Sequence, residues 1–522
     1  MNGTFRLEVY DMEARQMTPQ EAYSQLKERM SKISVLGSTA AVLYWDQEAY
    51  LPKKAFDHRG EQLAQLGSLR HEWFTDPQVG EWLAATEGSE LVKDRETEAA
   101  VNVREWRRLY DRVVKLPKEF VEDFTRTTTK ASQVWAEARK KSDFSLFAPL
   151  LEKIVELCRR KADLIGFKTE AYDVLLDEYE PGATTAEVEQ VFTALRPELV
   201  ELIGKIAGAP RKPDLGILRK RYDIDKQRLF CESLAAAQGY DFAQGRIDES
   251  VHPSCNGLGP YDTRVLTRYY LDDLAEGITG ITHEVGHSLY DIGHPDKTHW
   301  GTPMGECASL AIHESLSRMW ENIVGRSREY LTYFYPQLQR IFREELAEVS
   351  LEDFYGAMNF VAPSYIRVQA DEATYNLHIM LRFELERAMI RGDLKVKDIP
   401  GEWNRRFRDY LGIEVDNDAN GCLQDVHWSH GIHGYFPTYA LGNLCAAQFY
   451  ARAQSDLPGL LQDFAQGDFS RLLGWLTEKI HSRGFKYYSP ELCERVTGKA
   501  LSHRPLIDYL YGKYGEIYGI TR

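Results

Sequence analysis

Apolar residues recur at helical spacing along most of this chain, and helix-starting signals precede several of the repeats. Residues 18–21 (TPQE) combine an N-cap threonine, a proline at the first helical position and a capping-box glutamate. A second capping box occupies residues 184–187 (TTAE). The same periodicity predicts helices over 150–164, 308–323 and 373–390. We therefore expect a mainly α fold.

Strand-like sequence is scarce. The best example is Thr263–Tyr270 (TRVLTRYY), where β-branched and aromatic residues cluster. We find no internal repeat, low-complexity segment or long linker. The 522 residues, 43% of them apolar, are enough to bury a large core. These features predict one domain over residues 1–522, with two lobes around a groove and a small β-sheet.

The charge and cysteine content exclude several classes of protein. A net charge of −15 argues against a surface that binds nucleic acid, because phosphate affinity needs clustered basic residues. No apolar run approaches the roughly 20 residues that span a bilayer, and residues 1–16 do not resemble a secretory signal. The seven cysteines are scattered and include no C-x-x-C pair. We expect a cytoplasmic protein with reduced thiols and no membrane partner.

The stretch GITHEVGHSLYDIGHP (280–295) has the spacing of a metal site. On a helix, His283 and His287 share a face and could direct two imidazole nitrogens at one ion. Glu284, directly after the first histidine, could then act on a water molecule at the metal. Gly293 is placed to end this helix. The pattern predicts a catalytic divalent metal, with zinc as the usual choice.

The residues around this helix suggest two further features. An extended peptide could pair with the edge of the strand at 263–270 and present its scissile bond to the metal. Asp291, one turn after His287, either hydrogen-bonds a ligand histidine or lies in solvent. The strand directly before the helix would suit a peptidase.

Spacing alone leaves the third protein ligand open. His294 misses the third-histidine position of the metzincin pattern by one residue. Glu306 follows His287 by 19 positions (306 − 287), a common interval in zinc peptidases, and Glu314 follows it by 27 (314 − 287). On one helix these two glutamates would point about 80° apart and would not serve one ion together. The interval by itself favours Glu306.

Five phrases occur in order along the chain: WDQEAYLP (45–52), HEVGH (283–287), IHES (312–315), IRVQAD (366–371) and GCLQDVHW (421–428). Together they resemble the carboxypeptidase Taq family of HExxH zinc metallocarboxypeptidases, and the resemblance covers nearly the whole chain. Two further segments depart from that family's usual text. Residues 252–254 read HPS in place of HPF, and residues 262–267 (DTRVLT) delay the threonine of its DxRxT phrase.

The resemblance implies more than the spacing does. It moves the third metal ligand to Glu314, through the HES segment. It also implies a helical zincin-type body with a deep active-site groove and a small sheet next to the metal helix. Zn²⁺ would be the cofactor, with cobalt or manganese able to substitute, and the protein would be a homodimer. The substrates would be peptides with a free C-terminus.

A carboxypeptidase must also hold the C-terminal carboxylate of its substrate, and arginine does so with paired hydrogen bonds. Arg367 is the first candidate through its place in IRVQAD, although a salt bridge to Asp371 is an alternative reading of the same residue. Arg264 is a weaker candidate for this role. Gln424, in GCLQDVHW, is expected beside the substrate as a residue that orients the loop.

Residues 427–439 (HWSHGIHGYFPTY) are rich in histidine and tyrosine. We expect His427 and either Tyr435 or Tyr439 to donate hydrogen bonds to the oxyanion of the transition state. The aromatic residues could instead belong to the core. A second metal site on the three histidines of this stretch is disfavoured, because no carboxylate or cysteine accompanies them in register.

The sequence therefore predicts a metallocarboxypeptidase in which Glu284 is the general base. An endopeptidase on the same helical scaffold is the principal alternative. A catalytically inactive peptide-binding protein with a structural zinc is a second alternative, but such a site has no need of Glu284.

Overall fold

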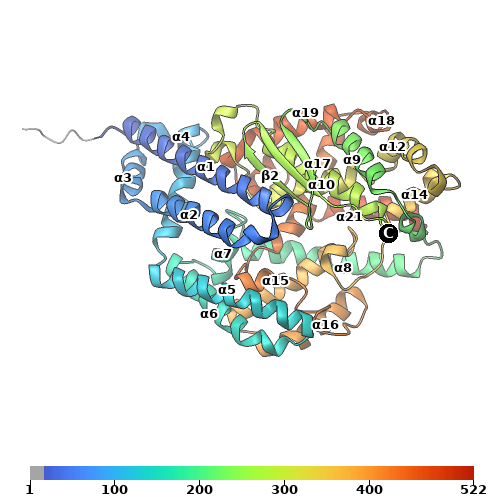
Figure 1. Cartoon of the computed structure of the whole chain (residues 1–522), viewed down its shortest axis with the longest axis horizontal. Coiled ribbons are helices and arrows are strands. Elements are labelled where there is room, and N and C mark those ends of the chain that lie inside the picture. Colours follow the sequence, from blue (N-terminus) through green and yellow to red (C-terminus); the bar gives the residue numbers. More distant parts are fainter. Residues whose placement is uncertain (1–16) are drawn as a thin grey trace, which may run out of the picture.

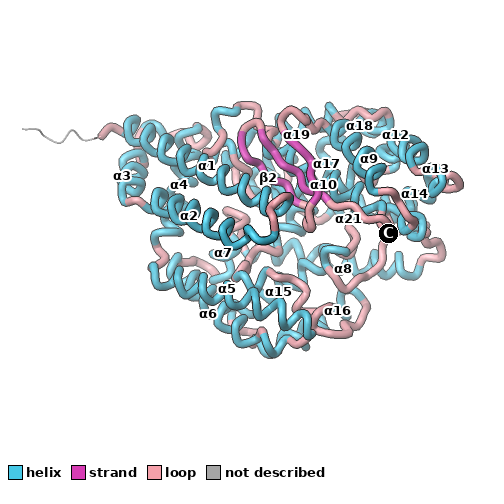
Figure 2. The backbone as a smooth tube through the Cα atoms, viewed as in Figure 1, coloured by secondary structure: helices cyan, strands magenta, loops and turns pink. Residues whose placement is uncertain are grey.

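The computed structural model describes residues 17–522, so the expectation for residues 1–16 lies outside the described part of the chain. Helices dominate it, as Figures 1 and 2 show, and this confirms the mainly α prediction. The helices are α1 (Pro19–Ala49), α2 (Phe56–Thr75), α3 (Pro77–Thr86), α4 (Glu98–Val114), α5 (Lys118–Lys141), α6 (Ala148–Ile165), α7 (Ala171–Leu176), α8 (Thr185–Gly208), α9 (Ile224–Gln238), α10 (Leu274–Asp291), α11 (Leu310–Arg318), α12 (Arg328–Ile341), α13 (Arg343–Leu346), α14 (Leu351–Met358), α15 (Tyr375–Arg391), α16 (Ile399–Leu411), α17 (Pro437–Asp456), α18 (Leu460–Ala465), α19 (Ser470–Lys479), α20 (Ser489–Thr497) and α21 (Arg504–Tyr518).

Both predicted capping boxes form. Thr18 caps α1: its hydroxyl accepts a hydrogen bond from the backbone N–H of Glu21, and the Glu21 carboxylate accepts one from the backbone N–H of Thr18. Thr184 and Glu187 do the same for α8. The helices expected over 150–164, 308–323 and 373–390 appear as α6, α11 with its continuation, and α15. At α1 and α8, local capping chemistry therefore marks where the helix begins.

The sheet has three strands in the order β1-β3-β2, with β1 (Gly245–Glu249) parallel and β2 (Ser254–Gly259) antiparallel to β3 (Asp262–Thr267). The predicted strand at 263–270 is thus real but ends at Thr267. Our expectation that a substrate pairs with its edge is wrong, because β3 is central and both of its edges are occupied. The open edges belong to β1 and β2.

Two hydrophobic cores lie under these elements. The larger runs from α5 to the C-terminal helix and includes residues of the sheet and of α10. A smaller one, built around Leu26, Leu83 and Trp106, joins α1, α3 and α4. In Figure 1 the N-terminal helices α1 and α2 lie near the sheet, with α5, α6, α15 and α16 below them, and α1 packs against β2.

The remaining bulk expectations concern cysteines and membranes. All seven cysteines are free thiols, and five of them are buried. Within residues 17–522, no helix combines the length and the apolar character needed to cross a bilayer.

Candidate metal centre

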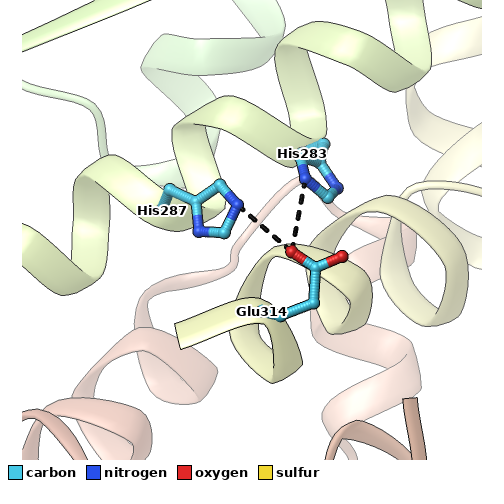
Figure 3. A group of neighbouring side chains, drawn as sticks. All are labelled: His283, His287 and Glu314. Atoms are coloured by element: carbon cyan, nitrogen blue, oxygen red, sulfur yellow. Dashed lines mark ion pairs between the residues drawn. The ribbon is translucent and has the colours of Figure 1, made fainter. Parts of the chain in front are cut away.

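Three side chains from two facing helices converge in the interior. His283 and His287 lie on α10 and Glu314 on α11, and Figure 3 shows the glutamate carboxylate directed at both imidazoles. Its Oε2 lies 3.8 Å from His283 Nε2 and 3.4 Å from His287 Nε2. One ligand atom from each residue lies within 4.8 Å of the other two. Two imidazole nitrogens and a carboxylate oxygen at this separation suit a divalent metal such as zinc.

Two glycines allow the helices to approach each other this closely. A Cβ at Gly286, inside HEVGH, would lie 2.7 Å from the Ser317 backbone of α11. A Cβ at Gly442 of α17 would lie 2.9 Å from Cγ of Glu314 itself. Contacts under 3 Å cannot be kept by a real side chain, so both positions require glycine for the packing that is observed. The metal helix and the third ligand are thus held by backbone contact.

A second set of charges holds the ligands in place. Glu321 lies on a π-helical turn (Met319–Val324) that continues α11, and its Oε2 is 2.9 Å from His283 Nδ1. Arg318 donates a hydrogen bond of 2.7 Å to Glu314 and one of 3.2 Å to Glu321. Arg326 donates to the other oxygen of Glu321. A carboxylate behind a ligand histidine fixes which ring nitrogen faces the metal.

The second histidine is held differently. The ring of His313 stacks on that of His287, with 4.4 Å between centroids and 14° between planes. Asp291 Oδ1 lies 2.7 Å from His313 Nε2. Asp291 therefore does neither of the two things expected of it, because it supports the neighbour of a ligand histidine rather than the ligand or the solvent. His287 Nδ1 has no hydrogen-bond partner among residues 17–522.

The protonation states of His287 and Glu314 suit metal binding. Burial, together with the adjacent His313, lowers the pKa of His287 to about 4, which keeps this imidazole neutral. Burial alone would raise the pKa of Glu314, but Arg318 and the two histidines hold it well below its usual range. Burial raises the pKa of Glu284 to about 7, close to the value that favours a general base at neutral pH. Glu284 is 6% exposed.

The rival ligands lie elsewhere. Glu306 is an exposed residue that follows a short 3₁₀ turn and is not on α11. His294 Nδ1 lies 2.9 Å from the backbone oxygen of Asp296. His430 contacts Ser132 and His433 contacts Cys158, so those histidines do not meet at one point. Among residues 17–522, His283, His287 and Glu314 form the one group of three or more potential metal ligands whose ligand atoms lie this close together.

The tyrosines of the 427–439 stretch lie close enough to Glu314 and to the arginine of IRVQAD for both charges to act on them. The rings of Tyr435 and Tyr439 are 5.3 Å apart, and His427 lies 5.5 Å from the first of them. Burial raises the pKa of both phenols, and the charges of Glu314 and Arg367 act on both. Each phenol therefore keeps its proton and can donate a hydrogen bond.

Arg367 is 5% exposed and does not pair with Asp371, the alternative that the sequence left open. Its Nε and Nη2 donate to Oδ1 of Asp425 at 3.0 and 2.8 Å, and its Nη1 donates to the Tyr375 hydroxyl. The guanidinium lies 5.0 Å from the ring centroid of Tyr439. Arg367 is therefore next to Tyr439, one of the two tyrosines expected at the active site.

The two other substrate-binding candidates have different surroundings. The carboxamide oxygen of Gln424 accepts a hydrogen bond from the Arg367 backbone, and its nitrogen donates to three backbone carbonyls. Arg264 forms a paired contact with Asp262 on its own strand and lies 4.7 Å from the ring centroid of Trp45 on α1. Gln424 thus fixes the position of Arg367, and Arg264 lies at the junction of α1 with the sheet.

Comparison with known proteins identifies the fold and its chemistry. Residues 25–514 match the sequence profile of the family described as Carboxypeptidase Taq (M32) metallopeptidase. The chain belongs to this family. The resemblance seen in the five phrases is thereby confirmed, and the protein is a metallocarboxypeptidase, a hydrolase that needs a divalent metal.

Individual relatives of this M32 peptidase agree over nearly their full length. The chain is 44% identical to Thermostable carboxypeptidase 1 of Thermus thermophilus, covering 96% of this chain and 100% of the relative. It is 36% identical to Carboxypeptidase 1 of Bacillus subtilis, covering 94% and 97%. The solved M32 carboxypeptidase of Deinococcus radiodurans superposes with a TM-score of 0.92 at 40% identity, covering 96% of this chain and 100% of that one.

Sequence reasoning missed several residues of the site. Glu321 follows Glu314 by seven positions, two helical turns, so its presence on the same helix face could have been inferred. Arg318, four positions after Glu314, carries the same signal. Arg382 could not have been found this way, because its partner Asp425 lies 43 positions further along the chain.

Proposed function

We propose that this metallocarboxypeptidase uses zinc, held by His283, His287 and Glu314, to release amino acids one at a time from the C-termini of peptides. The observation that supports this most directly is the convergence of two Nε2 atoms and one carboxylate oxygen beside the buried Glu284. A zinc ion there supplies a Lewis acid, which polarises the scissile carbonyl and makes water more acidic.

Glu284 is assigned the proton transfers. Its carboxylate takes a proton from the attacking water and later delivers it to the nitrogen of the leaving amino acid. Its burial supports this role, because the raised pKa makes proton uptake favourable near neutral pH. A structural metal site would need no such group.

His427, Tyr435 and Tyr439 are assigned to the developing oxyanion. The phenols retain their protons, and burial lowers the pKa of His427 to about 4, so that this imidazole is neutral. A neutral imidazole and two phenols can all donate hydrogen bonds to a negatively charged oxygen. Replacing each tyrosine with phenylalanine would identify the donor, since the larger fall in kcat marks the phenol that acts at the transition state.

Arg367 is assigned to the C-terminal carboxylate of the substrate. Its closeness to Tyr439 supports this role, and Gln424 holds its backbone in place. Arg264 remains a second candidate, which would require the peptide to reach the sheet below Trp45. The groove between two lobes, within a single domain over 1–522, is part of the same proposal.

The decisive assay compares two peptides that differ only at the C-terminus. The free acid should be shortened from its end, and the C-terminal amide should resist cleavage. Internal cleavage of the amide would instead establish the endopeptidase alternative. Hydrolysis that persists in a Glu284→Gln variant would contradict the assigned general base, and binding without hydrolysis by the metal-loaded wild type would favour the inactive peptide-binding alternative.

Metal identity, location and assembly complete the proposal. Reconstituting the metal-free protein with zinc, cobalt or manganese and comparing kcat would test the cofactor, with activity from each ion expected.

The free thiols agree with a reducing cytoplasm. We also propose a homodimer, without nucleic-acid or membrane partners. A monomeric mass by light scattering at micromolar concentration would overturn the dimer.

A further inference from the structure

One buried carboxylate lies between two buried arginines behind the tyrosines. Asp425 Oδ1 accepts two hydrogen bonds from Arg367, as described above. Its other oxygen, Oδ2, accepts one from Nε of Arg382 at 2.6 Å, and Nη2 of the same guanidinium lies 2.6 Å away. The Arg382 side chain is 0% exposed and that of Arg367 6%.

Among residues 17–522 no second carboxylate pairs with either guanidinium. Asp371 instead accepts hydrogen bonds from the backbone N–H groups of Ala373 and Thr374, directly before α15. Glu386, one turn beyond Arg382, binds Tyr172, Trp428 and a backbone N–H, and burial raises its pKa to about 7. Two full positive charges therefore face one full negative charge, and the cluster carries an uncompensated cation.

An uncompensated charge in a protein interior is costly unless a counter-ion arrives. Burial alone would raise the pKa of Asp425, but the two guanidiniums hold it well below its usual range, so protonation of this carboxyl does not add to the imbalance. The missing partner is an anion. Arg367 is the member that reaches Tyr439, whereas Arg382 packs 4.6 Å from the ring centroid of Trp403 in the core.

We propose that Arg382 is a positioning residue that sets the charge of the substrate-binding site. Its buried guanidinium offsets Asp425, so that Arg367 keeps an uncompensated positive charge for the C-terminal carboxylate of the peptide. Without Arg382, Asp425 would neutralise Arg367 and compete with the substrate for it. This inference rests on the proposed role of Arg367 and adds a residue that never touches the substrate.

The first test is Arg382→Met, which removes the charge and keeps much of the packing volume. The KM for a free-acid peptide should rise roughly ten- to a hundredfold, because one unit charge near the carboxylate is lost from a partly buried site. The kcat and the zinc content should stay within about twofold of wild type. A fall in kcat with an unchanged KM would overturn the proposal.

A binding measurement separates charge from structure. In a Glu284→Gln background, calorimetry gives dissociation constants for the free-acid peptide and for its C-terminal amide. Adding Arg382→Met should weaken the acid roughly tenfold or more and leave the amide nearly unchanged, because only the acid carries the charge. Equal weakening of both peptides would mean that Arg382 has a purely structural role.

A double variant tests the charge balance directly. In Arg382→Met with Asp425→Asn, the charge of Arg367 is again unopposed, and the asparagine oxygen can still accept its hydrogen bond. The KM for the acid should return to within about threefold of wild type. A KM as high as that of Arg382→Met alone, or higher, would overturn the proposal. If Arg382→Met alone does not fold, the double variant still tests the proposal, which predicts a KM within about threefold of wild type.

Two controls separate this inference from the proposed function. Arg382→Lys keeps the charge and should retain most of the affinity for the acid, as a charge-based role requires. Arg367→Met should raise the KM at least as much as Arg382→Met. If Arg367→Met leaves the acid-to-amide preference intact, the assigned carboxylate site is wrong. If Arg367→Met abolishes the preference and Arg382→Met does not, only the role of Arg382 fails.

Discussion

The metal centre and the arginine cluster are both buried groups of charges, but their imbalances have opposite signs. Around the triad, the carboxylates of Glu314 and Glu321 match the guanidiniums of Arg318 and Arg326, and Glu284, with a pKa of about 7, adds part of a further negative charge. Across the tyrosines, Arg367 and Arg382 outnumber Asp425. The first region lacks a cation, and the second lacks an anion.

The difference suggests how one interior can bind two unlike ligands without confusing them. Each cluster is nearly neutralised by its own ion pairs, and each lacks the charge that its ligand brings. Charges of both clusters, Glu314 of one and Arg367 of the other, act on Tyr435 and Tyr439, the residues proposed to contact the scissile carbonyl of a bound peptide. In the proposed arrangement, the sign of the uncompensated charge favours the metal on one side and the substrate carboxylate on the other.

The largest effect is expected from removing the charge that binds the metal. Glu314→Ala should abolish stoichiometric zinc and reduce hydrolysis to background, because two histidines alone form an incomplete site. Glu306→Ala is the matched control and should keep both metal and activity, since this glutamate is exposed and lies off α11. Metal content by plasma mass spectrometry together with peptide hydrolysis decides between them. Zinc lost only from Glu306→Ala would reverse the ligand assignment.

Glu284→Gln should separate metal binding from catalysis. The kcat should fall about 10²- to 10⁴-fold, the range typical of a lost general base, while the zinc content stays at wild-type level. The amide matches the carboxylate in shape, so binding of a free-acid peptide should change little. A variant that loses zinc would show that Glu284 is needed to hold the metal. Its role would then be structural, and the assignment as general base would lose its support.

Local sequence predicted the mainly helical class and several of the individual helices. Both capping boxes and the periodic segments form helices, because cap hydrogen bonds and an apolar face act over a few residues. The strand at 263–270 was found, but its central position in the sheet was not. That position depends on pairing with β1 and β2, whose sequences have little strand character. Register between segments is a non-local property.

The site shows the same division. The i, i+4 spacing brings His283 and His287 to one face, whereas only the family resemblance points to Glu314, since the sequence interval favours Glu306. Only the packing of α10 on α11 brings the carboxylate to the histidines, and this contact depends on Gly286. The pairing of Asp425 with Arg382 joins α15 to a distant loop, and nothing in either segment alone indicates it.

On the arginine side, His427 should make the stability of the protein sensitive to acid. Burial lowers its pKa to about 4, against about 6.5 in an unfolded chain. Between these values the unfolded chain binds a proton that the folded protein does not, so stability falls as the pH drops from 6.5 to 4. The loss from this residue is up to about 3 kcal/mol.

Denaturant unfolding at pH 7 and pH 4.5 measures this loss. His427→Asn should show a smaller decrease in unfolding free energy between the two pH values than the wild type does. His58→Asn is the control at an exposed histidine and should follow the wild type. An identical decrease in all three proteins would show that His427 is not held neutral.

A change behind the metal should have a moderate effect. Glu321→Gln keeps a hydrogen-bond acceptor near His283 Nδ1 but removes one of the negative charges next to the metal ligands. Zinc affinity should fall about 10- to 100-fold, as is usual when a carboxylate behind a ligand histidine is lost. Competition with a chromogenic chelator measures the affinity. An unchanged affinity would mean that the charge excess at this cluster resides in Glu314 and Glu284 alone.

The smallest effect is expected from Gly442→Ala, which tests packing rather than charge. The added methyl group would lie 2.9 Å from Cγ of Glu314 and must displace either that side chain or α17. Overpacking of this kind costs roughly 1–3 kcal/mol, so we expect a modest loss of stability and a several-fold loss of zinc affinity. Gly204→Ala is the matched control, because a Cβ there meets nothing within 4 Å, and it should be neutral or slightly stabilising. If Gly442→Ala lowers stability but leaves zinc affinity unchanged, the backbone contact supports the fold and does not position the third ligand.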